Sequence, residues 1–448
     1  MSAEAAFVAH ALGVRRKDIP TEAIAAARTF YLDTLCVGAA GAMSPLAEPV
    51  RSVARRWGTG GKVAVWGTGE TLPAAGAAYV NGFQIHCQEY DCVHERAVVH
   101  PMATIGAALT AEAADRGHSG ADLLAAIVVA VDVAAGLGVA VTSPIRFFRP
   151  ATAGLFGATL GIARMRGFDE AAARNALGYA LAQAAGTMQA HVEGKPALPV
   201  QIANAARAAI VACDLAQAGL EGPSEALEGP YGYFALFEHS VDPKPVLASL
   251  GRIWRVLEVS HKPWPTGRAA QGGIALMLAL RAEGVDASEV EAIRLIAPPL
   301  IKRLVGRKAF AGMCINHARL CFQYVGARAL MTGQVGLSDF TESALGDADT
   351  LALGARIEVV EDGTDDPAAF APQIAEARLK DGRQIAVETR ALYGSPQDPM
   401  RPEDQRAKQE ACLAFARLPL ALADTLAARV AGMETEAEGG AIAALLKP

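Results

Sequence analysis

Hydrophobic positions in the first half of the chain recur with the period of an α-helix. Glycine follows Arg116, Arg166 and Ala218, where helices commonly end. Thr21 follows Pro20 and is expected to cap the first long helix. The pattern predicts a helical domain over residues 1–245, with helices near 21–41, 72–88, 101–115, 120–139, 152–166, 169–186 and 200–219.

The pattern changes after about residue 245. Residues 291–298 and 355–362 have strand-like content, and 375–392 reads as two strands joined at Asp381-Gly382, a strong hairpin signal. Residues 316–333 between them are predicted to be helical, ending at Gly333. We therefore expect a mainly α protein: a large helical domain, a smaller α+β lid domain over 246–400, and helices over 401–448 that pack back on the first domain.

Composition narrows the classes of partner. Hydrophobic residues make up 52% of the 448 residues, charged residues 20%, and the formal net charge is −6. Nucleic-acid-binding proteins usually carry a basic field, so no nucleic acid partner is expected. The apolar run 123–141 contains Asp132 near its centre, which favours a buried core helix over a membrane span.

Cysteine usage bears on the cellular compartment. The seven cysteines form no CxxC pair, so neither a disulfide framework nor a structural zinc site is indicated. An odd number of scattered cysteines fits a reducing cytoplasm. The first 18 residues lack the basic and apolar regions of a signal peptide. A cytoplasmic protein is expected.

Residues 86–101, HCQEYDCVHERAVVHP, concentrate titratable groups within an Ala-rich surrounding sequence. Such groups are costly to bury unless they are paired, so the segment indicates a site. His100 precedes Pro101 and a helical run, where the helix dipole favours the neutral imidazole. A neutral imidazole can accept a proton, which suits a general base. The alternative is a histidine that only caps the helix.

Two other chemistries are open for this segment. His86, Glu89, Asp91 and His94 are metal-ligand types, but their spacing matches no common signature, so no metal is expected. Cys87 and Cys92 could be nucleophiles, although cysteines in Ala-rich helices more often fill the core.

Cationic residues in apolar loops indicate an anionic ligand. Lys195 lies between Gly194 and Pro196, and Lys262 precedes another proline. Arg149 and Arg268 lie in similar loops, and arginine forks match carboxylates. Neither loop resembles a phosphate-binding loop, which favours a small carboxylate over a phosphate ester. Each lysine taken alone would more often be an exposed loop residue.

Seven segments, in order, resemble the MmgE/PrpD family, which includes 2-methylcitrate dehydratase, cis-aconitate decarboxylase and iminodisuccinate epimerase. The resemblance implies a helical domain, an α+β lobe that covers the cleft, a homodimer, and no metal or organic cofactor. The segments are YLDTLCVGAAGA, AAYVNGFQIHCQEYDCVHERAVVHP, PATAGLFGA, GKPALPVQIANAARAA, LEGPYGYFALF, HKPWPTGRA and ARLCFQYVGARALMTGQVGLSDFT.

The resemblance also implies roles for individual residues. His100 matches the histidine of the family's HP motif, and Asp91 and Glu89 match acids of its acidic motif. Lys195 and Lys262 match two loop lysines associated with the active site. The candidate catalytic residues are therefore His100, Asp91, Lys195, Lys262 and His94, and the candidate substrate-binding residues are Arg149, Arg268, Glu89, Gln271 and Arg319.

Three positions depart from the family pattern. The family often has FHP where this chain has Phe147-Phe148-Arg149-Pro150, and DFDDTH where it has EYDCVH. Gln271 stands where the family often has histidine. These departures predict a substrate that differs from those of the named relatives, with Arg149 reading a carboxylate.

We therefore expect a cofactor-independent lyase of the dehydratase type that acts on a small di- or tricarboxylate. Its first step would be proton abstraction next to a carboxylate. Two alternatives are open: an epimerase or isomerase that uses the same proton abstraction, and a non-catalytic carboxylate-binding homologue.

Overall fold

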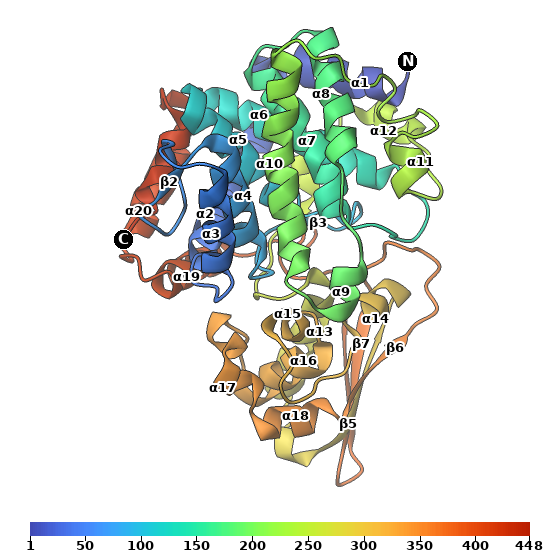
Figure 1. The fold of residues 1–448 in the computed structure, drawn as a ribbon. Coiled ribbons are helices and arrows are strands. Elements are labelled where there is room, and N and C mark those ends of the chain that lie inside the picture. Colours follow the sequence, from blue (N-terminus) through green and yellow to red (C-terminus); the bar gives the residue numbers. More distant parts are fainter.

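The computed structural model describes residues 1–448 as a large helical lobe above a smaller α+β lobe (Figure 1). This arrangement confirms the predicted fold class. The helices of the larger lobe are α1 (Ala3–Gly13), α2 (Thr21–Gly41), α3 (Ala47–Trp57), α4 (Ala74–His86), α5 (Pro101–Arg116), α6 (Gly120–Val139), α7 (Arg149–Met165), α8 (Glu170–Gln183), α9 (Gln189–Glu193), α10 (Ala197–Gln217), α11 (Tyr233–Phe237) and α12 (Lys244–Ser249). Two short strands, β1 (Val63–Ala64) and β2 (Thr71–Leu72), pair beside them.

Small side chains let the helices of this lobe approach closely. A Cβ added at Gly157 in α7 would lie 2.5 Å from the carbonyl oxygen of Ala130 in α6. A Cβ at Gly82 in α4 would lie 3.3 Å from the Cβ of Ala206 in α10. The alanine-rich composition therefore produces tight helix–helix packing around one continuous apolar core.

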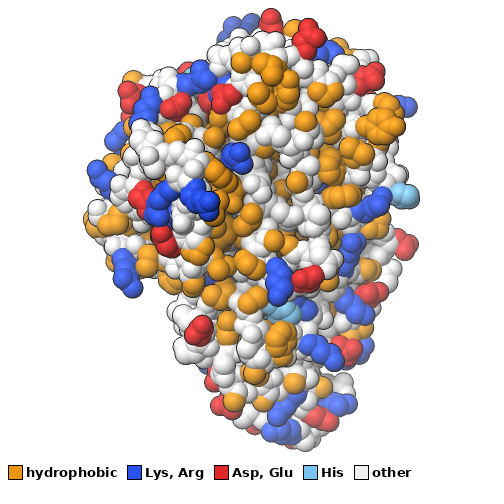
Figure 2. Space-filling view, in the orientation of Figure 1, with side chains coloured by type: hydrophobic (Ala, Val, Ile, Leu, Met, Phe, Trp, Pro, Cys, Tyr) orange, Lys and Arg blue, Asp and Glu red, His pale blue; other side chains and the backbone are white.

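Two helices, α6 and α10, are long and apolar enough to cross a membrane by length and composition alone. The apolar window of α6 is 89% buried, as the core-helix interpretation requires. Asp132 in α6 is paired there with His10. The window of α10 is 61% buried, and α10 lies at the front of the view in Figure 1. Hydrophobic side chains gather over the helical lobe on this face of the molecule (Figure 2).

The smaller lobe is built on a mixed four-stranded sheet in the order β6-β5-β7-β8. Strands β5 and β6 run parallel, and the other pairs are antiparallel. Gly382 has φ +90° in the hairpin between β7 and β8, as the sequence predicts. The elements are β5 (Val290–Ala297), β6 (Ile357–Glu361), β7 (Gln373–Leu379), β8 (Gln384–Thr389), α13 (Arg268–Ala282), α14 (Pro299–Val305), α15 (Ile315–Arg319), α16 (Phe322–Thr332), α17 (Glu342–Leu345) and α18 (Ala348–Gly354).

Two local predictions were wrong. Residues 316–333 form two helices, α15 and α16, because the chain leaves helical geometry at Leu320 and Cys321. The backbone N–H of Cys321 is bonded to Ala318, and its thiol donates to the carbonyl of Arg307. Thr21 is the first residue of α2, with Pro20 in the capping position and no side-chain cap.

The C-terminal helices pack back on the helical lobe, and a short strand pair holds the 86–101 segment against the chain that leads into the smaller lobe. Helices α19 (Pro402–Phe415) and α20 (Leu422–Ala431) pack against α2 in the helical lobe. Strand β3 (Val93–His94) pairs antiparallel with β4 (Val259–Ser260), which brings the 86–101 segment beside residues 259–262. The seven cysteines are unpaired.

Candidate active site

The 86–101 segment places its polar side chains together at the base of the helical lobe. His86 is the last residue of α4, and His100 immediately precedes Pro101, the first residue of α5. The loop between these helices carries Glu89 and Asp91. Because both helices are anchored in the core, the loop has fixed ends and its side chains converge.

Asp91 is the centre of this cluster and is fully buried. Its Oδ2 accepts hydrogen bonds from His100 Nδ1 (3.0 Å) and His86 Nδ1 (3.1 Å). Lys262 Nζ lies 3.6 Å from Oδ1. Burial alone would raise the pKa of Asp91, but the two imidazoles and the ammonium hold it well below its usual range. Asp91 is therefore a buried anionic carboxylate that orients two histidines.

Glu89 and Lys262 form a second buried pair beside Asp91. Lys262 Nζ donates to the Glu89 carboxylate (3.0 Å) and to its backbone carbonyl (3.2 Å). Despite burial, the charges of Lys262, His86 and His100 lower the pKa of Glu89 to about 2. Glu89 also has φ +49°, a left-handed conformation that is uncommon for residues other than glycine. The double contact from Lys262 holds this strained residue in place.

His100 has the geometry of a general base. It occupies the capping position of α5, but its side chain makes no helix-capping hydrogen bond. Asp91 accepts from Nδ1, which leaves the lone pair of the neutral ring on Nε2. Burial and then the charge of Lys262 lower the pKa of His100, so the neutral form prevails near pH 7.

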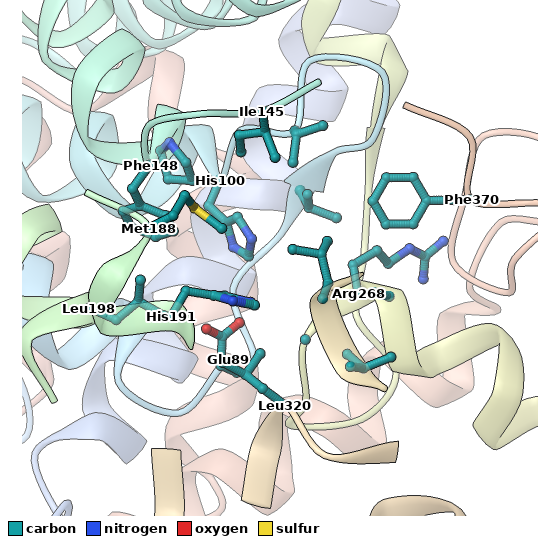
Figure 3. Close-up of a pocket in the computed structure, with 17 residues that line it drawn as sticks. Glu89, His100, Ile145, Phe148, Met188, His191, Leu198, Arg268, Leu320 and Phe370 are labelled. Carbon is teal, nitrogen blue, oxygen red and sulfur yellow. The ribbon is translucent and has the colours of Figure 1, made fainter. Parts of the chain in front are cut away.

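His100 and Glu89 line a cavity of about 50 Å³ between the two lobes (Figure 3). The helical lobe contributes Phe148, and the smaller lobe contributes Arg268 among other residues. Eleven of the 17 lining residues are hydrophobic, so charges in the cavity are poorly screened. Val98 also lines it with φ +52°, a strained conformation for a β-branched residue next to the site.

His86 lies behind His100, their ring centroids 4.9 Å apart and the rings edge to face. Burial alone would lower the pKa of His86, but Asp91 and Glu89 raise it overall. The ligand atoms of His86, Glu89, Asp91 and His100 all lie within 4.8 Å of one another, so this set could hold a metal ion. Lys262 supplies a positive charge to the same two carboxylates.

The cysteine alternative is not supported by the environment of either thiol. Burial raises the pKa of Cys87 to about 12 and that of Cys92 well above its usual value. Neither side chain lines the cavity. Because the thiolate is the nucleophile, these residues are chemically inert core groups.

The structure does not bring His94 or Lys195 into the cavity lining. His94 Nε2 donates to Glu258 (2.9 Å), and its Nδ1 accepts from the backbone N–H of Ala97 (3.1 Å). Both nitrogens are therefore occupied, away from His100. Lys195 is exposed at the turn between α9 and α10. Neither residue therefore joins the cluster around His100 in this structure.

The guanidinium of Arg149 is bonded to protein groups and is not available to bind a ligand in this structure. Its Nε donates to Glu238 Oε1 (2.9 Å) and its Nη2 to Glu238 Oε2 (3.2 Å). Its Nη1 donates to the carbonyl of Ala97 (3.3 Å). The fork is buried and satisfied by the protein itself, so the expected carboxylate contact is replaced by an internal ion pair.

Three other predicted substrate-binding residues are also engaged within the protein. Arg268 lines the cavity, but its Nε donates to Glu95 (2.7 Å) and its Nη atoms donate to backbone carbonyls. Gln271 accepts from Arg268 and donates to the carbonyl of Trp264 (2.8 Å). Arg319 bonds the carbonyl and side chain of Gln88, away from the lining.

Sequence reasoning missed one titratable residue of the cavity lining. His191 in α9 is 6% exposed and faces the same cavity as His100. The only signal available was its position four residues before Lys195, just ahead of a segment that resembles the family. No periodicity distinguishes it from a surface histidine.

Fold and site together define a class: helical proteins with a buried histidine–carboxylate centre under a smaller α+β lobe. Residues 5–246 match the MmgE/PrpD N-terminal domain, and residues 264–424 match the MmgE/PrpD C-terminal domain. The chain therefore belongs to the MmgE/PrpD family.

Curated relatives are identical to this chain at a little over a quarter of the aligned positions. It is 28% identical over 418 residues to the cis-aconitate decarboxylase of Homo sapiens, covering 88% of this chain and 84% of the relative. It is 26% identical to the cis-aconitate decarboxylase-like protein oryM of Aspergillus oryzae, covering 82% of this chain and 87% of the relative. The names of these relatives refer to decarboxylation of a carboxylate and not to dehydration.

Proposed function

We propose that this protein is a lyase that removes water from a small hydroxy-di- or tricarboxylate. The reaction begins with abstraction of a proton from the carbon next to a carboxylate. The observation that carries the proposal is His100, held by Asp91 through Nδ1 with its basic Nε2 available to a cavity formed by both lobes. Proton transfer by a positioned histidine is worth roughly 10²–10⁴-fold in rate.

The surrounding charges support this chemistry. When His100 takes the proton, the adjacent Asp91 carboxylate stabilises the imidazolium that forms. The electron pair of the C–H bond moves toward the carboxylate of the substrate and then expels hydroxide. His100 returns its proton to that hydroxide, which leaves as water. Lys262 keeps Glu89 and Asp91 anionic, so neither competes as a proton donor.

Decarboxylation is the second candidate, and the names of the relatives favour it. Loss of CO₂ requires that a proton be delivered to carbon, so His100 would act in its protonated form. The lowered pKa of His100 favours the neutral base and therefore favours dehydration over decarboxylation. Phe148 lines the cavity at the motif where the family often has histidine. Epimerisation is the remaining alternative, in which the proton returns to the carbon from which it was taken.

A homodimer and a cytoplasmic location remain part of the proposal. Trp57 in α3 is 48% exposed, and its ring contacts Arg207 of α10. This apolar face of the helical lobe offers a surface for a second copy (Figure 2).

The test is a panel of hydroxy-tricarboxylates, hydroxy-dicarboxylates and cis-aconitate, incubated with the protein in D₂O. Product alkene, released CO₂ and deuterium at the carbon next to the carboxylate separate dehydration, decarboxylation and epimerisation. His100→Gln is expected to lower kcat on the active substrate at least about 100-fold. His94→Gln, in the same segment but away from the cavity, is the matched control. Normal turnover by His100→Gln contradicts its role, and no turnover or exchange with any acid contradicts the enzyme proposal.

A further inference from the structure

The cavity contains a histidine that the proposed reaction has not used. His191 projects from α9 toward His100 and Glu89, and the three side chains converge on one space (Figure 3). It comes from a different segment than the 86–101 cluster. Its neighbour Phe148 cannot donate a hydrogen bond into the cavity.

The hydrogen bonds of the two histidines assign them opposite tautomers. Arg307 Nη2 lies 3.3 Å from His191 Nδ1, and a guanidinium can only donate. His191 Nδ1 must therefore carry a lone pair, which places the proton of the neutral ring on Nε2. In His100, Nδ1 donates to Asp91 and Nε2 carries the lone pair. The only side-chain hydrogen bond of His191 is the one from Arg307 to Nδ1, so Nε2 is left for a ligand in the cavity.

We propose that His191 is a second catalytic residue, which donates a hydrogen bond from Nε2 to the substrate oxygen that becomes negatively charged. This inference rests on the proposed function, because the charge develops only when His100 removes the proton. The substrate C–H electron pair moves into the bond toward the carboxylate carbon, and the charge is spread over the carboxylate oxygens. His191 keeps its proton throughout. The cavity thus presents one acceptor and one donor on facing imidazoles.

The environment keeps His191 in the form that this role requires. Burial and the charges of Arg307 and Arg303 lower the pKa of His191 to about 4, while Glu89 opposes them. A neutral imidazole can stabilise an oxyanion without protonating it. Preorganised donors of this kind act strongly where water is excluded.

Arg307 is the positioning residue for His191. Its Nη2 also donates to the carbonyl of Leu304 (3.2 Å), which fixes the guanidinium on the smaller lobe. The contact to His191 therefore crosses from one lobe to the other. Buried Nη1 of Arg307 has no partner in the protein.

The kinetic test compares substitutions that keep or remove the donor. His191→Phe is expected to lower kcat about 10²–10³-fold, the cost of one oxyanion donor. His191→Gln retains an N–H donor and is expected to stay within about tenfold of the wild type. Arg307→Met frees His191 to ionise and is expected to add an acidic limb to the pH profile of kcat. Arg307→Lys keeps the positive charge and should largely restore the wild-type pH profile. Equal kcat values for His191→Phe and the wild type, or for the Phe and Gln variants, would overturn the proposal.

A second measurement does not depend on turnover. Long-range ¹H–¹⁵N spectra of the ¹⁵N-histidine-labelled protein report which ring nitrogen carries the proton. His191, assigned by comparison with His191→Gln, is expected to be neutral and protonated on Nε2 at pH 7. Its Nε2 signal is expected to shift when unreactive propane-1,2,3-tricarboxylate is added. An imidazolium, the opposite tautomer or an unchanged signal contradicts the inference, whereas failure of the lyase proposal alone leaves these signals as expected.

Discussion

Two buried aspartate–histidine pairs in this molecule have nearly the same hydrogen-bond length but different surroundings. Asp91 accepts from His100 at 3.0 Å beside the cavity, and Asp132 bonds His10 at 2.9 Å inside the helical lobe. The second oxygen of Asp132 accepts from the backbone N–H of Arg255 (2.7 Å). His10 does not line the cavity between the lobes. The pair alone is therefore no sign of chemistry; access of the second imidazole nitrogen to a cavity distinguishes the candidate site.

The charges around the two carboxylates differ in the same way. Three cationic or basic side chains face Asp91 and hold its pKa well below the usual range. Burial dominates at Asp132 and raises its pKa, because the opposing effects of His10, the backbone N–H of Arg255 and the charge of Arg255 are smaller. A site that must stabilise an imidazolium needs a carboxylate that stays ionised. A structural pair has no such requirement.

The largest expected effect comes from exchanging each aspartate for asparagine. Asp91→Asn removes the charge that orients and stabilises His100, and kcat should fall about 10²–10⁴-fold. Asp132→Asn keeps the shape of the side chain and can still accept from Arg255. Its kcat is expected to remain within about threefold of the wild type, as for a change outside the reacting groups.

Steady-state kinetics and circular dichroism on both variants decide this comparison. Both must be folded under the assay conditions for the kinetics to be compared. A similar loss of kcat in the two variants would mean that access to the cavity is not what separates the pairs.

Arg149 and Glu238 give the next largest effect, on stability instead of rate. The two side chains are buried and joined by two hydrogen bonds. Arg149→Met leaves Glu238 uncompensated, and the free energy of unfolding should fall by about 3–5 kcal/mol. The double variant Arg149→Met/Glu238→Gln should recover part of the loss. Denaturant unfolding measures these values, and a raised KM in a folded Arg149→Met protein would instead support carboxylate binding by Arg149.

The sequence predicted most of the fold because the elements carry strong local signals. The helical period, the glycines after Arg116 and Arg166, and the hairpin at Asp381-Gly382 all depend on neighbouring residues. The break at Leu320–Cys321 was missed because it depends on a contact of the Cys321 thiol with Arg307, 14 residues away in the chain.

The site was only partly predictable for a similar reason. Asp91, Glu89 and His100 lie in one segment, so their density in the sequence revealed them. Lys262 was proposed from its loop, and β3–β4 pairing is what brings it to that segment. Arg149 was misjudged because its partner, Glu238, lies 89 residues further along the chain. His191 was missed because only the tertiary fold places α9 on the cavity.

The smallest expected effect is the pH dependence of the Asp132 pair. Burial raises the pKa of Asp132 above its ordinary 3.8, so the folded protein holds this proton more tightly than the unfolded chain. Its contribution to the free energy of unfolding therefore falls as pH rises from about 4 through the folded pKa. Asp132→Asn lacks this titration, so its destabilisation relative to the wild type should shrink between about pH 4 and about pH 7. Denaturant unfolding of both proteins across this range measures the difference. A destabilisation that grows with pH would show that Asp132, like Asp91, is held as a stabilised anion, and the contrast between the two pairs would then rest on cavity access alone.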